Sequence, residues 1–326
     1  MLLIKPLLAD FREGSVAWLI QRYLDEMNGW AGKPAVRPML HSQLRTLRLI
    51  QRSPKLSAVS APELREHHLI EHCKARVATG RKPATVQQDV TFLVGAYKYA
   101  LPVWKDCGDL APALAALIAV KPFLAKHNLI GRSQPRTERP TDEQHERLKA
   151  YFAKQNGDRR TKINMVEIAE WQRIQGMRIS NTCRLEWGHW NRAEQTMLLT
   201  KMKDPRRRNR SKVVALTEEA QSFLIEKEAR RLRPGDPTEK IFPYYEKSCG
   251  ARYTLAKKAL GIVNLHLHDS RRDLSARLVE ELGLSKEQAI GVTGHETTRE
   301  YERTYMKVNP ATIARLLIER REKAEA

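Results

Sequence analysis

One stretch of the 326-residue chain has neither a helix pattern nor a strand pattern, and it separates the chain into two parts. Asn128–Pro140, NLIGRSQPRTERP, contains a glycine, a serine, two prolines and three arginines and lacks apolar periodicity. Proline ends helices, and glycine and serine favour turns, so this composition predicts a linker. We therefore expect one domain over residues 1–130, a linker over 131–140 and a second domain over 141–326.

The first domain is expected to be almost entirely helical. Ser42–Arg52 carries leucine and isoleucine on one stripe with helical spacing, and residues 60–63 read as a capping box that opens another helix. Thr85 is interpreted as the start of a third helix that ends at Pro102. Pro112 suits the first turn of one more helix with a kinked continuation.

The second domain is expected to be mixed. Thr196–Lys201 and Ser211–Leu216 are short β-prone runs on either side of a strongly basic turn, which predicts a hairpin with a long tip. Capping boxes at Thr141 and Ser285 predict helix starts, and Asn309 with the following proline is expected to cap a final amphipathic helix. The predicted fold class is mainly α with one small β-sheet.

The charge of the chain points to its class of partner. The net charge is +20, and both halves are basic. An excess of this size opposes compaction and favours a polyanion, such as nucleic acid or an anionic membrane. Two basic halves are expected if both touch the same long anion, and no stretch approaches the ~20 apolar residues of a membrane span.

The ends and the cysteines of the chain indicate its location. The apolar start is interrupted by Lys5 and Pro6 and lacks a signal-peptide cleavage site. The four cysteines are widely separated and form no CxxC pair, so we expect neither disulfides nor zinc. A reducing cytoplasm is the expected location, next to the nucleoid if the source is bacterial.

Polar clusters follow one another along the second domain in a fixed order. They are Arg178 in GMRIS, Lys203 in the hairpin tip, His268 with Arg271 in HDSR, His295 after a glycine, and Tyr305 in TYMKV. Two arginines, a lysine and two histidines around one tyrosine hydroxyl suit a phosphodiester substrate. His266 and His268 lack the further ligands of a metal site, so neither a metal nor another cofactor is expected.

The order of these motifs resembles that of the tyrosine recombinase (phage integrase) family. The motifs span about residues 160–308, and APELREHHLIEH and PATVQQDVTFLVGAYKYA in the first half look like that family's core-binding domain. The resemblance implies a helical core-binding domain and a mixed α/β catalytic domain that form a clamp around DNA.

The resemblance also implies a role for each residue of the motifs. Arg178 and Arg271 would bind the scissile phosphate. His268 would act as an acid/base or a phosphate ligand, and His295 would hydrogen-bond the phosphate or the nucleophile. Lys203 would be the general acid, and Tyr305 would attack to form a 3′-phosphotyrosyl link.

Two of these assignments leave alternatives. Lys201 competes with Lys203 for the role of general acid, since both lie at the start of the hairpin tip. Family members often have nine residues from the Gly-His histidine to the tyrosine, whereas here Tyr305 lies ten residues after His295 and Tyr301 lies six after it. The TYMKV context favours Tyr305. Asn181 also stands where the family often has an acidic residue.

The expected function is site-specific DNA recombination, as in an integrase of a phage or another mobile element. The phosphotyrosyl ester conserves the energy of the broken DNA bond, so neither a metal nor ATP is required. Expected partners are double-stranded recombination sites, a tetramer of the chain on two such sites, and an accessory directionality factor. The alternatives are a DNA-relaxing enzyme like type IB topoisomerases and a catalytically inactive DNA-binding protein.

Overall fold

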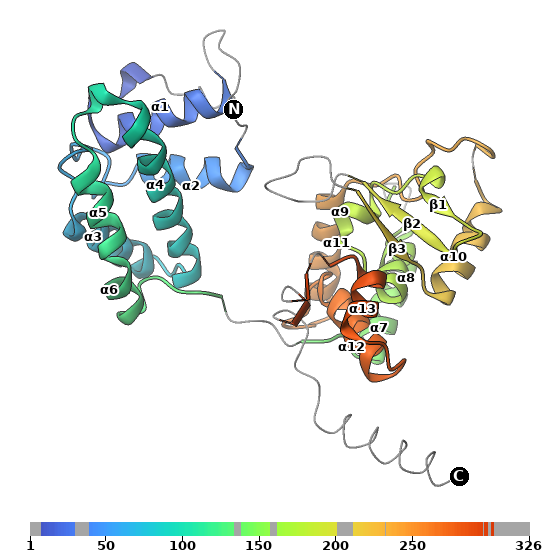
Figure 1. Ribbon diagram of the computed structural model, residues 1–326. Coiled ribbons are helices and arrows are strands. Elements are labelled where there is room, and N and C mark those ends of the chain that lie inside the picture. The colour runs from blue at the N-terminus through green and yellow to red at the C-terminus, as the bar shows by residue number, and fades with distance from the viewer. Residues whose placement is uncertain are drawn as a thin grey trace. The chain divides into compact units, whose positions relative to one another are not determined.

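The computed structural model describes residues 8–29, 39–133, 138–156, 162–200, 211–231, 233–295, 297–298 and 301–302. The chain forms two compact units, Met1–Gln134 and Pro135–Ala326 (Figure 1). The division falls inside the stretch 131–140 in which we expected a linker. We call the first the helical unit and the second the mixed unit.

The described part of the helical unit contains α-helices and short 3-10 helices. These are η1 (Leu8–Asp10), α1 (Val16–Asn28), α2 (His41–Gln51), α3 (Glu66–Ala78), α4 (Pro83–Val103), η2 (Lys105–Cys107), α5 (Ala111–Ala119) and α6 (Lys121–Lys126). The long helix α4 packs against α1, α2, α3 and α5. Its apolar residues, among them Leu93 and Tyr97, lie at the centre of a single core.

Several predicted helix boundaries in this unit are confirmed, and two are wrong. Helix α2 and the break between α5 and α6 lie where they were predicted. The predicted start at residues 60–63 is wrong because Ser60 forms a β-bridge with Ser15, so α3 begins only at Glu66. Helix α4 begins at Pro83 rather than after Thr85, since proline suits a first helical turn.

The described part of the mixed unit consists of helices around a small sheet. Its elements are α7 (Asp142–Asn156), α8 (Met165–Gln175), α9 (Ile179–Thr182), η3 (Trp187–His189), β1 (Trp190–Asn191), β2 (Thr196–Leu199), β3 (Lys212–Ala215), α10 (Glu218–Glu228), α11 (Glu246–Ala259), α12 (Asp269–Glu280) and α13 (Lys286–Thr293). The sheet is antiparallel with the order β1-β2-β3, and Met197 pairs with Val214. The predicted fold class, mainly α with one small sheet, is confirmed.

Helix α8 organises the mixed unit. It contacts α7, α10, α11 and α12, and its Trp171 packs against Phe223 and Phe242 in the main core. A smaller core joins α12 to α13 through Leu274, Leu278, Ala289 and Tyr301. Helix α12 therefore packs on α8 and on α13, and α13 in turn packs on strand β3 of the sheet.

The predicted helix start at Thr141 is confirmed by a reciprocal capping box. The backbone nitrogen of Gln144 donates to Thr141 Oγ1 at 3.2 Å, and the backbone nitrogen of Thr141 donates to Gln144 Oε1 at 3.1 Å. The two predicted hairpin strands are also confirmed.

The hairpin tip with Lys201 and Lys203 lies outside the described residues, as does the predicted helix after Asn309. No helix among the described residues is long and apolar enough to span a membrane.

Candidate active site

The Arg178 segment leaves α8 through a left-handed glycine. Gly176 caps the helix with φ +56°, and a Cβ atom there would lie 2.9 Å from Leu274 Cδ2 of α12. Glycine is required both by this conformation and by the close approach. Arg178 follows as the N-cap residue of α9 and is half-buried. The segment is therefore pressed against α12.

Helix α12 carries the next two predicted residues. His268 is its N-cap residue, and Arg271 lies in its first turn with only 1% of its surface exposed. Arg271 Nη1 donates to the carbonyl oxygen of Gly176 at 3.0 Å and also to that of Thr293. Arg271 Nε donates to His295 Nε2 at 3.1 Å. The guanidinium of Arg271 thus links α12 to the ends of α8 and α13.

The hydrogen bonds around His295 define its tautomer. The hydroxyl of Thr293 donates to the carbonyl oxygen of Ala289 at 2.8 Å, so its oxygen accepts from His295 Nδ1, 2.6 Å away. Nε2 then remains as the acceptor for Arg271. Burial lowers the pKa of His295 far below its usual value, and nearby Arg271, Arg178, His268 and Lys212 lower it further. His295 is therefore neutral at physiological pH.

The turn that presents His295 rests on the sheet. Gly294 caps α13 with φ +71°, and a Cβ atom there would lie 3.1 Å from Val214 and 3.2 Å from Leu199. Lys212 on β3 donates from Nζ to the carbonyl oxygen of His295 at 2.5 Å. The glycine of the Gly-His pair is thus required by its backbone conformation and by its contact with β2 and β3.

His268 lies in the same field of positive charge. Desolvation by the atoms around its ring, followed by the charges of Arg271, Arg272 and Arg178, lowers its pKa to about 4. Part of the residue nevertheless reaches solvent. His268 therefore presents a neutral imidazole at the surface of a cationic site.

Tyr301, one of the two candidate nucleophiles, is a packing residue in this structure. It is 1% exposed, and its hydroxyl donates to the carbonyl oxygen of Ser275 at 2.5 Å. Its ring meets that of His295 edge-on, with 5.3 Å between the centroids. Tyr305 lies outside the described residues.

The structure thus brings together the four predicted residues that it describes: Arg178, His268, Arg271 and His295. Lys203 lies outside the described part of the chain. Two further residues support the site without having been predicted: Lys212, the last of seven basic residues in KMKDPRRRNRSK, and the buried Gln175. Gln175 Nε2 donates to the carbonyl oxygens of Ala215 and Val292 at 3.0 and 3.3 Å, so it links α8 to the sheet and to α13.

No group of three His, Cys, Asp or Glu residues in the described part of the chain is placed to hold a metal ion. The four cysteines are free and buried. The chemistry that the described site offers is therefore a set of fixed cations and neutral imidazoles, which suits an anionic substrate.

A comparison with family models identifies the second half of the chain. The model of the phage integrase family matches residues 138–312, which is more than half of the protein. The chain belongs to the phage integrase family. It is a site-specific tyrosine recombinase.

Solved structures with the recombinase fold resemble most of the chain at low sequence identity. The Tn1549 transposon integrase in complex with transposon right end DNA has a TM-score of 0.62 and 14% identity, over 94% of this chain and 99% of that one. A lambda integrase tetramer bound to a Holliday junction has a TM-score of 0.60 and 17% identity, over 91% and 82%. No curated protein matches the recombinase by sequence. At such identities the structural likeness shows the fold.

Proposed function

We propose that this recombinase cuts and rejoins double-stranded DNA at specific sites through a 3′-phosphotyrosyl intermediate. The observation that carries the proposal is the buried Arg271–His295 pair, with Arg178 and His268 close enough to depress the pKa of the histidine. A site that holds its imidazoles neutral while it concentrates guanidinium groups is suited to a phosphodiester.

Arg178 and Arg271 would bind the non-bridging oxygens of the scissile phosphate. Charge builds up on these oxygens during attack, and fixed cations stabilise it without reorganisation. Arg271 is already held by Gly176, Thr293 and His295, so its guanidinium is preorganised before DNA arrives. His268, neutral and partly exposed, is suited to accept a proton or to donate a hydrogen bond at the phosphate.

Tyr305 would be the nucleophile. The alternative, Tyr301, uses its hydroxyl to bond the carbonyl oxygen of Ser275 and has almost no exposed surface, so attack by it would require the local packing to open. Lys203 would protonate the leaving 5′ oxygen, with Lys201 as the alternative. The phosphotyrosyl ester keeps the energy of the broken bond, so religation needs neither ATP nor a metal.

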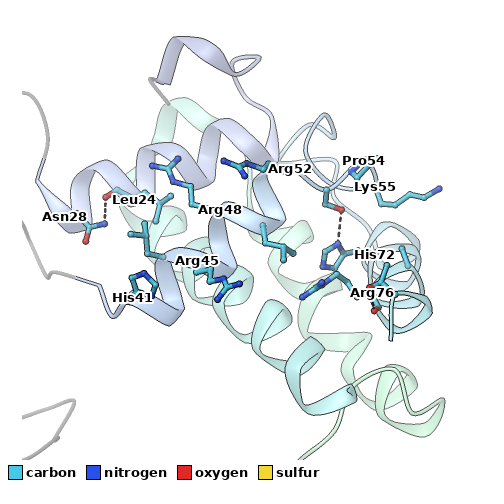
Figure 2. Close-up of a pocket in the computed structure, with 15 residues that line it drawn as sticks. Leu24, Asn28, His41, Arg45, Arg48, Arg52, Pro54, Lys55, His72 and Arg76 are labelled. Carbon is cyan, nitrogen blue, oxygen red and sulfur yellow. Dashed lines mark hydrogen bonds between the residues drawn. The ribbon is translucent and has the colours of Figure 1, made fainter. Parts of the chain in front are cut away.

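The helical unit would hold the DNA as a core-binding domain. A cleft of about 1120 Å³ lies in this unit, with Arg45, Arg48 and Arg52 on one side and His72 and Arg76 on the other (Figure 2). None of the described residues that line it is acidic. Arg76 and His72 are bonded to the carboxylate of Asp89 behind the lining, so the cations offered to DNA include those of Arg45, Arg48 and Arg52. Such cations favour contacts with phosphates, which give affinity and register rather than sequence readout.

Exchange of strands between two duplexes requires several protomers on two sites. We propose a tetramer, as in the lambda integrase tetramer bound to a Holliday junction. An accessory directionality factor remains part of the proposal, as does action on DNA in the cytoplasm.

Covalent trapping tests the nucleophile. A nicked suicide substrate that carries the recombination site would be incubated with the unaltered protein, Tyr305→Phe and Tyr301→Phe. An SDS-resistant adduct that is lost in Tyr305→Phe and retained in Tyr301→Phe is expected. Loss in Tyr301→Phe alone would reverse the assignment, and no adduct from the unaltered protein despite tight binding would overturn the enzyme proposal. Exchange between two labelled sites separates recombination from simple relaxation of supercoils.

A further inference from the structure

Helix α12 is bound on one side to the segment through which the chain enters the mixed unit. Arg139, three residues before α7, donates from Nε to Asp273 Oδ1 at 3.0 Å and from Nη1 to Glu280 Oε2 at 2.7 Å. The two carboxylates are seven positions apart on α12, and their side chains are only 9% and 5% exposed. A single arginine from the linker region therefore spans two turns of this helix.

The two carboxylates depend on Arg139 to different degrees. Asp273 has a second cation, since Arg277 Nε donates to its Oδ2 at 3.2 Å. Among the described residues, Glu280 is paired with one cation, Arg139, through its Oε2 atom. Its other oxygen, Oε1, has no hydrogen-bond partner among these residues. Because a buried carboxylate is unfavourable without a counter-ion, the position of Arg139 is strongly tied to α12.

The same helix carries the phosphate-binding machinery. His268 is its N-cap residue, and Arg271 lies two residues before Asp273. The guanidinium of Arg271 reaches Gly176, Thr293 and His295, so a displacement of α12 would shift the proposed site as a whole. The hydrogen bonds of Arg139 go to Asp273 and Glu280 rather than to these groups, so it acts on them through α12.

We propose that Arg139 is a positioning residue for strand cleavage, which ties the interdomain linker to α12 and thereby sets the place of Arg271. The inference rests on the proposed function. The segment before α7 is thereby held against the helix that carries Arg271.

The test compares single-turnover cleavage rates at saturating suicide DNA in the full-length protein. Arg139→Gln should slow adduct formation roughly 10- to 100-fold, since small misplacements of reacting groups have effects of this size. Arg139→Lys should give an intermediate rate, because one ammonium cannot bind both carboxylates as the guanidinium does. Arg147→Gln is the matched control: Arg147 on α7 donates to the carbonyl oxygen of Leu260, away from α12, and its loss should leave the rate unchanged.

A second variant separates positioning from simple stabilisation. Arg139→Gln/Glu280→Gln removes the unpaired buried carboxylate, so thermal stability should recover while the cleavage rate stays low. Recovery of the rate together with stability would show that Arg139 only neutralises charge and would overturn the inference, as would an unchanged rate in Arg139→Gln. No adduct from the unaltered protein would overturn the proposed function, and this inference with it.

Discussion

Gly176 offers the sharpest test of how the site is assembled. Its backbone is left-handed, with φ +56°. A Cβ atom would lie 2.9 Å from Leu274 Cδ2, 3.2 Å from Leu274 Cβ and 3.3 Å from Arg271 Cα. The first of these atoms is the end of a flexible side chain, but the last belongs to the backbone of α12. Gly176→Ala is therefore expected to push α12 away from the end of α8.

The expected loss of stability has two parts. A left-handed alanine costs about 1–2 kcal/mol relative to glycine. Overpacking against Leu274 and the backbone of Arg271 adds about 1–3 kcal/mol. The sum of about 2–5 kcal/mol is a large share of the ~5–15 kcal/mol that stabilises a typical domain. Because Gly176 O accepts from Arg271, the cleavage rate should also fall about tenfold or more.

Gly283→Ala is the matched control in the same unit. Gly283 has φ +64°, but nothing lies within 4 Å of its Cβ position, so only the backbone cost of about 1–2 kcal/mol is expected. Urea unfolding of the full-length variants measures both losses, and the transition of the helical unit serves as an internal reference. Covalent trapping below the unfolding temperature measures the rate. Equal losses of stability in the two variants, or a normal rate in Gly176→Ala, would refute the packing argument.

Three further predictions concern other parts of the chain. In the helical unit, Asp89→Ala leaves Arg76 and the buried His72 without their carboxylate. The free energy of unfolding of that unit, measured in urea, should fall by about 3 kcal/mol, and an unchanged unfolding transition would contradict this. Burial, then Arg173 and Lys149, lower the pKa of His145 to about 4, so the unfolded chain binds this proton first as pH falls. Stability should therefore decline between pH ~6.5 and ~4, by about 1–3 kcal/mol from this residue, and His145→Gln should flatten that part of the curve measured by urea unfolding. Arg52→Gln, at the exposed edge of the cleft, should lower the slope of log affinity against log salt by about 1 in anisotropy titrations with DNA, and an unchanged slope would exclude a phosphate contact there.

Local signals were read correctly where local contacts decide the structure. Thr141 and Gln144 form their capping box within one turn, and Ser285 and Gln288 form the other one at the start of α13. Residues 60–63 carry a similar capping pattern, yet they are held outside a helix by Ser15, a partner 45 positions earlier in the chain. The pattern itself contains no information about that partner.

The site was predictable to the extent that chemistry dictates residue types. Cationic side chains suit a phosphodiester, and the resemblance to the tyrosine recombinase family selected Arg178, His268, Arg271 and His295 by their order. Lys212 and Gln175 act through contacts across 83 and 117 positions of the sequence, with the carbonyl oxygens of His295 and Val292. Every residue has a backbone carbonyl, so the residue type at the acceptor position does not reveal such a hydrogen bond. The roles of Lys212 and Gln175 could therefore not be predicted from the sequence.

The burial of Arg271 bears on how inactive forms of this recombinase should be made. An arginine with a proposed role in substrate binding is a natural choice for an inactive variant, but Arg271 also bonds two backbone carbonyls and an imidazole in the interior. Its removal would strand those acceptors, at about 1–3 kcal/mol for each, so the loss of activity would be confounded with misfolding. In a mutational scan scored by cellular abundance, Arg271 would group with core positions such as Trp171, whereas the half-buried Arg178 would tolerate change.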